Sequence, residues 1–270
     1  MKSIHTQKGF TLVELAIVMT IIGLLIGGIL KGQELMENAR VTSTVAQVKS
    51  YEAAVTTFRD AYNAMPGDMP NTANRLPGCA GTICEPTAAG QFGNGIVGAT
   101  GWGTAGFTAQ MAAPANGAFA AVGGETQLFW VHLLKADLIA GVTDSPTRAA
   151  GQLAWGDSHP AGRIGGGFVA GFGDGARGPG ATGALPGVTG AVVALVQNIT
   201  VAPGTTAGLN PLTPARAAQI DRRIDDGRPT TGYVQAYGVA ASCFGPAAAN
   251  AQYIEATISK DCGLIFRIQG

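Results

Sequence analysis

The stretch that decides the fold is residues 8–30, KGFTLVELAIVMTIIGLLIGGIL, near the start of the 270-residue chain. The 21 residues from 10 to 30 are apolar except for three side chains, those of Thr11, Glu14 and Thr20. A run of this length and polarity predicts a helix that can cross a lipid bilayer. Lys2 and Lys8 precede it and favour a cytoplasmic N-terminus, so the rest of the chain would lie outside the cytoplasm.

Two ordinary explanations of this segment fit less well than a functional one. A secretory signal would have small residues at a cleavage site after the apolar run, but residues 31–40 read KGQELMENAR. A plain membrane anchor leaves Glu14 unexplained, because an ionised carboxylate within a membrane is costly unless it is paired. Glu14 is therefore a candidate functional residue.

The heptapeptide KGFTLVE at residues 8–14 resembles the prepilin cleavage motif of type IV pilins and type II secretion pseudopilins. The resemblance implies that a membrane prepilin peptidase cleaves after Gly9 and that the new amine of Phe10 is methylated. It also implies that Glu14 pairs with the terminal amine of a neighbouring subunit during assembly. The implied partners are copies of the chain or related pilins, the peptidase, an inner-membrane assembly platform and, before assembly, membrane lipid.

These features divide the chain into four expected segments: a leader peptide at 1–9, a transmembrane and filament-core helix at 10–30, an amphipathic continuation at 31–65, and a globular head at 66–270. A single helix through 10–65 would be roughly 80 Å long, and Pro66-Gly67 is expected to end it. Its second half carries an apolar stripe at helical spacing: Leu35, Val41, Val45, Val48, Tyr51, Val55, Phe58 and Tyr62.

Four glycines in the stem allow two interpretations, because small residues let membrane helices pack closely and also lower helix stability. They are Gly23, Gly27, Gly28 and Gly32. Many pilins have a proline at the twenty-second mature position, where this chain has Lys31. The sequence therefore leaves open whether the glycines serve close packing or local unwinding.

The head is predicted to combine helices with an antiparallel sheet, an α+β class that resembles the type IV pilin-like fold, and its many glycines indicate long loops. Residues 126–139 predict a buried helix and residues 191–201 a strand rich in β-branched residues. Residues 213–226 predict a second helix, with Thr213 as N-cap, Pro214 in the first turn and Gly227 after its end. A further strand is expected after residues 227–232, and a final one at 263–268.

Four cysteines, Cys79, Cys84, Cys243 and Cys262, suggest two disulfides in an exported chain. Three pairings are possible, and proximity favours Cys79–Cys84 with Cys243–Cys262. A zinc site of four thiolates is the alternative, but neither pair has the short spacing typical of such sites. The C-terminal cysteine loop resembles the loop that joins the last strands of type IV pilin heads.

Composition argues against several other functions. Seventeen basic and 17 acidic residues balance, which makes a general nucleic-acid binder unlikely and leaves room for a local basic patch. No catalytic motif is present, so we expect a protein that is not an enzyme and has no cofactor. Asp221, Asp225 and Asp226 are weak calcium candidates, although arginines among them favour surface ion pairs.

We therefore expect a structural filament subunit, located first in the bacterial inner membrane as a single-pass protein and then in a periplasmic or cell-surface filament. Two alternatives share the same stem. One is a pseudopilin of a type II secretion system, and the other is a minor or tip pilin that acts as an adhesin or DNA-binding module.

Overall fold

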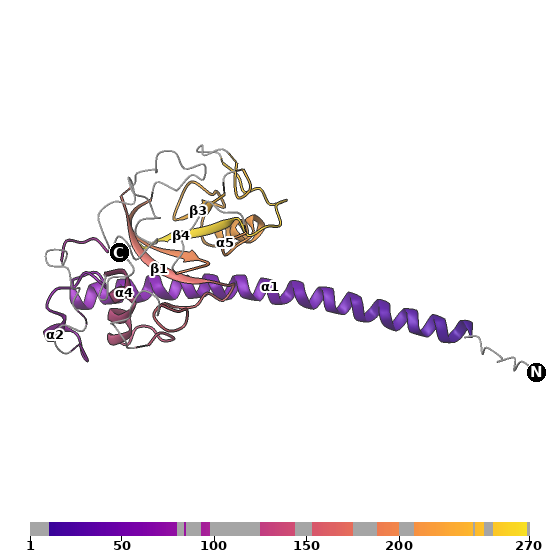
Figure 1. Ribbon diagram of the computed structural model, residues 1–270, viewed down its shortest axis with the longest axis horizontal. Coiled ribbons are helices and arrows are strands. Elements are labelled where there is room, and N and C mark those ends of the chain that lie inside the picture. Colours follow the sequence, from indigo (N-terminus) through magenta and orange to yellow (C-terminus); the bar gives the residue numbers. More distant parts are fainter. Residues whose placement is uncertain are drawn as a thin grey trace, which may run out of the picture. The chain divides into compact units, whose positions relative to one another are not determined.

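The computed structural model describes residues 11–79, 84, 93–97, 125–143, 153–174, 188–199, 208–239, 241–245 and 251–268. Gly9 and Phe10, the predicted processing residues, lie outside these ranges. The chain divides into two compact units, residues 1–40 and 41–270. The second unit contains the sheet and the shorter helices that Figure 1 labels.

The long helix α1 spans Leu12–Tyr62 without interruption. It ends at Tyr62, four residues before Pro66, because Asn63 adopts a left-handed conformation with φ 48° and breaks the helical path. Seven of its side chains are buried, and all of them lie in its second half: Val41, Thr44, Val48, Tyr51, Ala54, Val55 and Phe58. The predicted apolar stripe is therefore confirmed from Val41 onward, whereas Leu35 is 63% exposed.

A four-stranded antiparallel sheet forms the centre of the head, in the order β1-β2-β4-β3. The strands are β1 (Gly167–Asp174), β2 (Thr189–Val196), β3 (Val234–Gly238) and β4 (Cys262–Arg267). The sequence predicted three of these strands to within a few residues. It did not predict β1, whose glycine-rich sequence GFVAGFGD has few of the residues that favour strands.

Side chains alternate between the two faces of the sheet along each strand. Both faces are buried. One face, with Phe168, Leu195 and Phe266, belongs to the main core together with α1 residues such as Tyr51. The other face, with Val169, Tyr237 and Ile265, forms a second cluster covered by Leu153 and Trp155. A sheet buried on both sides explains why β2 and β4 are almost continuously apolar.

Helix α4 (Glu125–Lys135) is buried around its whole circumference from Glu125 to Leu133. It is shorter than the predicted 126–139, because Asp137 takes φ 58° and the chain turns back. Trp130 of α4 packs edge-on against Tyr51 of α1 with ring centroids 5.1 Å apart, and Tyr51 meets Phe168 of β1 at 5.3 Å. These three rings join helix to sheet in the main core.

Two further helices complete the described elements, α2 (Thr72–Arg75) and α5 (Pro214–Ile224). Helix α5 begins as predicted, with Pro214 in its first turn and Thr213 at the N-cap position in an extended conformation. The prediction of Thr213 as the N-cap residue is confirmed, although its side chain makes no capping hydrogen bond. The backbone carbonyl of Thr213 accepts bonds from the amides of Arg216 and Ala217.

The turn after α1 is fixed by two buried polar side chains. The Asp68 carboxylate accepts hydrogen bonds from the consecutive amides of Gly93, Asn94 and Gly95, at 2.6, 3.2 and 2.6 Å. His132 of α4 accepts a bond from the Gly67 amide at Nδ1 (2.8 Å), and its Nε2 donates to the Cys84 carbonyl (2.9 Å). Together they tie the turn to a helix and to two distant loop segments.

Gly67 has no room for a side chain at this junction. Its φ is 86°, and an added Cβ would lie 2.3 Å from the backbone oxygen of Glu125. The turn can therefore pack against α4 only with glycine at this position.

We predict that the His132 contact makes the head sensitive to acid. Burial lowers the pKa of His132 from 6.5 to about 4, because desolvation disfavours the charged ring. The neutral ring is also the form whose Nδ1 accepts the Gly67 bond. As the pH falls from about 6.5 to about 4, the unfolded chain takes up a proton that the folded chain excludes, so stability falls across that window.

The measurement is the melting temperature of the full chain in detergent micelles between pH 7 and pH 4, for the wild type and His132→Asn. The wild type should lose more of its melting temperature than the variant over this range. His159 is also buried with its pKa lowered, to about 3, so His159→Asn serves as a second comparison. Parallel pH profiles for the wild type and His132→Asn would contradict the prediction.

Candidate assembly site

The first turn of α1 is closed by a reciprocal pair of side chains, Thr11 and Glu14. The Oε2 atom of Glu14 accepts hydrogen bonds from the Thr11 amide at 2.9 Å and the Thr11 hydroxyl at 2.8 Å. The Thr11 hydroxyl in turn accepts a bond from the Glu14 amide at 3.2 Å. This is a capping box, which satisfies amides that the start of a helix leaves without partners.

The capping box gives Glu14 a position that the sequence interpretation did not foresee. The Thr-x-x-Glu spacing of residues 11–14 is the sequence pattern that could have predicted the capping box. The carboxylate is held at the start of the helix. Both recorded bonds use one carboxylate oxygen, so a capped Glu14 can still accept a donor at its other oxygen.

The helix that follows exposes a continuous apolar surface. Within residues 1–40, the large apolar side chains of α1 from Leu12 to Met36 are 45–87% exposed. This helix is long and apolar enough to cross a membrane, by length and composition. Thr20, which is polar, bonds the Ile17 carbonyl at 2.8 Å and so satisfies its hydroxyl within the helix. Glu14 is therefore the one ionisable group of the apolar run.

The four stem glycines are in regular helix within this exposed segment. A Cβ added at Gly23, Gly27, Gly28 or Gly32 would meet nothing within 4 Å. No contact with a described residue of the chain requires glycine at these positions. Close packing against another helix and local unwinding both remain compatible with them.

The two disulfides have the pairing that proximity favours. Cys79 bonds Cys84 with Cα atoms 5.5 Å apart, and Cys243 bonds Cys262 with Cα atoms 5.1 Å apart. All four cysteines are buried. A thiolate zinc site is not formed, because the sulfur atoms are bonded in pairs.

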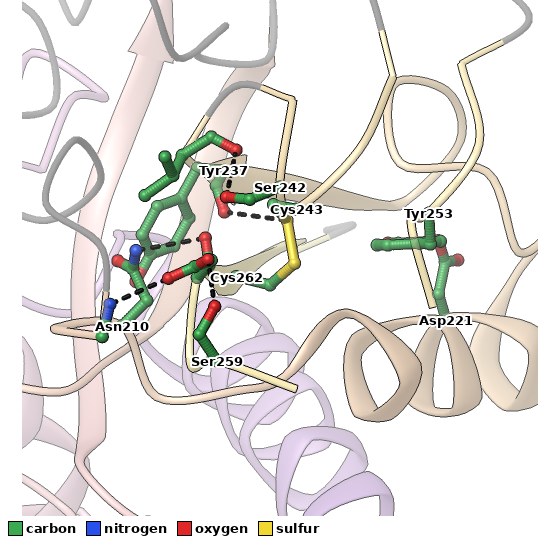
Figure 2. Close-up of a disulfide and its surroundings, with 11 residues drawn as sticks. Asn210, Asp221, Tyr237, Ser242, Cys243, Tyr253, Ser259 and Cys262 are labelled. Carbon is green, nitrogen blue, oxygen red and sulfur yellow. Dashed lines mark hydrogen bonds between the residues drawn. A yellow bond between two sulfur atoms is a disulfide. The ribbon is translucent and has the colours of Figure 1, made fainter. Parts of the chain in front are cut away.

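Around the C-terminal disulfide, polar groups bind the loop that it closes (Figure 2). Asp261, next to Cys262, accepts a bond from the Gly208 amide at 2.8 Å and from the Ser259 hydroxyl. Its carbonyl accepts the side-chain amide of Asn210 at 3.1 Å. A disulfide closing a loop of this size contributes about 3 kcal/mol in the chain-entropy model. The loop is therefore held both covalently and by hydrogen bonds.

The acidic cluster of α5 is an internal support for a loop. Asp221 is fully buried and accepts bonds from the Tyr253 hydroxyl at 2.7 Å and the Gly227 amide at 3.2 Å. Figure 2 shows Tyr253 lying over Asp221. The predicted surface ion pairing is wrong for Asp221, because its partners are a hydroxyl and an amide, while Arg222 pairs with Glu255.

Asp225 and Asp226 bind the same loop. Asp225 accepts the amides of Tyr233 and Val234, and Asp226 accepts the Arg228 amide and the Thr231 hydroxyl. One oxygen from each of Asp221, Asp225 and Asp226 lies within 4.8 Å of the others. A calcium ion would have to compete with these bonds, so the geometry gives no support for calcium beyond the clustering itself.

Sequence reasoning predicted the cysteine pairing, which is confirmed, and an assembly role for Glu14, which stays a prediction. It did not predict the hydrogen bonds of Thr11, Asp68, His132 and Tyr253. The spacing of Thr11 and Glu14 could have indicated the capping box. The other three act through contacts between residues far apart in the chain, for which the sequence holds no local signal.

Comparison with known proteins supports the interpretation of the N-terminus. The family model described as "prokaryotic N-terminal methylation motif" matches residues 4–30. This motif marks prepilins of the type IV pilin and pseudopilin type. Searches of curated proteins and of solved structures find no match.

We predict that Thr11 keeps the first turn of α1 closed. Thr11→Ala removes the hydroxyl of the capping box, and the amides of the first turn should exchange with solvent roughly fivefold faster, as expected for the loss of a ~1 kcal/mol cap. Thr11→Ser keeps the hydroxyl and should exchange like the wild type. The measurement is amide hydrogen exchange of the full chain in micelles, and equal rates in all three proteins would contradict the capping role.

We also predict that Asp221 makes the head less stable as the pH rises. Burial raises the pKa of Asp221 from 3.8 to about 7, and the neighbouring carboxylates of Asp225 and Asp226 add to the shift. The folded chain therefore holds a proton that the unfolded chain has lost, and this stabilisation disappears as the pH rises from about 4 through about 7.

Asp221→Asn keeps a neutral acceptor for Tyr253 and has no proton to lose. Its melting temperature should therefore rise relative to that of the wild type as the pH increases from 5 to 8. Asp60→Asn, an exposed position on α1, is the matched control and should follow the wild type. If Asp221→Asn also follows the wild type, the carboxyl group of Asp221 is not protonated in the folded head.

Proposed function

We propose that this prepilin-type chain is a structural subunit of a type IV pilus or a related filament. Cleavage after Gly9 by a prepilin peptidase would leave Phe10 as the methylated N-terminal residue, and the subunit would assemble through α1. The observation that carries the proposal is the exposed apolar surface of α1 from Leu12 to Met36, headed by Glu14.

The physical argument starts from that exposed surface. Apolar side chains over this length need lipid before assembly and other subunits afterwards, because burial in either is worth about 25 cal/mol per Å² of apolar area. The head contains its own core of helices and sheet, so the apolar surface of the stem is available for packing with other copies. The N-methylation motif supports the same role, since it marks a class of structural precursors.

Glu14 would give this packing its register. Between apolar helices, an uncompensated carboxylate is costly, and the amine of a neighbour's Phe10 is a donor that neutralises it. The capping box orients the carboxylate at the head of the helix, where an axially displaced neighbour would present its own N-terminus. The inner membrane would be the site of the precursor, with Lys2 and Lys8 on the cytoplasmic side.

A pseudopilin of a secretion system would use the same stem. Deleting the gene distinguishes a pilus subunit from a pseudopilin, because each deletion would abolish a different process. Loss of surface filaments on deletion supports a pilus subunit. Loss of export of folded proteins, with surface filaments intact, supports the secretion alternative. A minor subunit would give a third result, in which filaments remain and the chain is scarce in sheared material.

We predict that Glu14→Ala and Glu14→Gln strongly reduce filament yield while leaving cleavage intact. Sheared filaments are quantified, and mass spectrometry of the membrane fraction determines whether the chain begins at methylated Phe10. Glu34→Gln is the matched control, because Glu34 lies on the same helix beyond the apolar run, in an exposed pair with Lys31. A normal yield from Glu14→Ala would exclude the proposed pairing, and a chain that keeps residues 1–9 would exclude the proposed processing.

A further inference from the structure

A surface hollow of about 680 Å³ lies where the last turns of α1 and the turn that follows meet one end of the sheet. The described residues that line it come from several segments: Arg59 and Met65; Gly95; Phe172; Gly190 and Ala191; and Arg267 and Ile268. The register of the strands brings the sheet residues of the hollow together. Phe172 of β1 pairs with Ala191 of β2, and the adjacent Val192 pairs with Arg267 of β4. The hollow belongs wholly to the unit of residues 41–270.

Two arginines give the hollow its charge. Arg59 lies in the last turn of α1 and is partly buried, and Arg267 ends β4 and is exposed. No acidic side chain is among the described residues that line this hollow. Within the described part of the chain, neither guanidinium has a recorded ion pair or hydrogen bond, whereas Arg222 and Arg223 of α5 are both engaged.

An adjoining hollow contains two acidic residues, neither of which is among the described residues that line the larger hollow. Arg59 also borders this second hollow, together with Asp60 and Asp68. The Asp68 carboxylate is taken up by the three amides of residues 93–95. Asp60 is exposed to solvent and does not line the larger hollow. The larger hollow is therefore a local basic site on a chain whose total charge is zero.

We propose that this hollow binds a phosphate group that carries two negative charges, either free phosphate or the terminal phosphate of a monoester. Guanidinium groups bind oxyanions through paired hydrogen bonds, which favours arginine over lysine in such a site. Two arginines match a phosphate monoester, whose charge at neutral pH is about −1.5 to −2, better than a carboxylate with a single charge. The diester phosphates of a nucleic acid carry one charge each and fit less well.

The lining also sets what can accompany the phosphate. Met65, Phe172, Ala191 and Ile268 provide apolar surface beside the two charges. Gly190 has no side chain, and no described atom lies within 4 Å of the place where its Cβ would be, so this part of the lining leaves space in the hollow. A small organic group attached to the phosphate can thus lie against the apolar residues while the arginines hold the oxygens.

The test is calorimetric titration of the full chain in detergent micelles, at constant ionic strength, with inorganic phosphate and separately with glycerol phosphate. The expected result is saturable binding that weakens by about tenfold or more in Arg59→Gln and in Arg267→Gln, the loss typical of a charge-assisted hydrogen-bonding partner. Arg163→Gln changes an exposed arginine that does not line the hollow and should bind like the wild type.

Two further measurements separate this site from a general attraction of anions. Arg59→Lys and Arg267→Lys keep the charges, and so the favourable interaction of residue 59 with the end of α1, but lose the paired hydrogen bonds, so they should still bind more weakly than the wild type. Binding should also weaken below about pH 6, where the phosphate takes up a proton.

Tighter binding of glycerol phosphate than of inorganic phosphate would identify a monoester as the ligand, and the reverse would identify free phosphate. The proposal is overturned by an absence of saturable binding, by unchanged binding in the Arg59→Gln/Arg267→Gln double variant, or by tighter binding of a single-stranded oligonucleotide without terminal phosphates. None of these outcomes bears on filament assembly, which the Glu14 variants test separately.

Discussion

The carboxylate of Glu14 sets the main physical constraint on the stem, because it is the one ionisable group in the apolar run of residues 10–30. It lies at the start of an apolar helix whose side chains are exposed from Leu12 to Met36. In lipid or between packed helices such a group needs a donor, and the Thr11 amide and hydroxyl supply two within the same turn. The proposed pairing with a neighbour's amine would add a third donor to the Glu14 carboxylate, which the two Thr11 bonds already hold in place. The capping box therefore satisfies part of the hydrogen-bonding requirement of Glu14 within its own helix.

The head meets a different physical requirement, because its glycine-rich sequence offers few apolar side chains over long stretches of loop. Its described loops are held by single polar contacts and covalent bonds at a few positions. Asp68 binds three consecutive amides, His132 joins the turn after α1 to Cys84, and Asp221 joins α5 to Tyr253. Each contact links segments far apart in sequence, and closing such a contact costs more chain entropy than closing a local one.

Two of these contacts respond to pH in opposite directions. His132 is buried neutral and loses its contribution as the pH falls, whereas Asp221 is buried with a raised pKa and loses its contribution as the pH rises. The two dependences cover nearly the same window, from about pH 4 to about pH 7, with opposite signs. In the wild-type head they therefore largely offset each other, and each becomes visible when the other residue is replaced.

The sequence by itself determined the stem, the class of the fold and the pairing favoured for the disulfides. A long apolar run, its glutamate and the helical stripe from Val41 onward are local patterns, and local patterns fix helix position and burial. Strand β1 and the internal role of Asp221 came only from the tertiary structure. The reason is that β1 is a strand through its pairing with β2, and Asp221 is buried through its contact with Tyr253, and no local pattern of residues signals either partner. The hollow between Arg59 and Arg267 is of the same kind, since two arginines 208 positions apart become neighbours of one cavity only when α1 and β4 fold together.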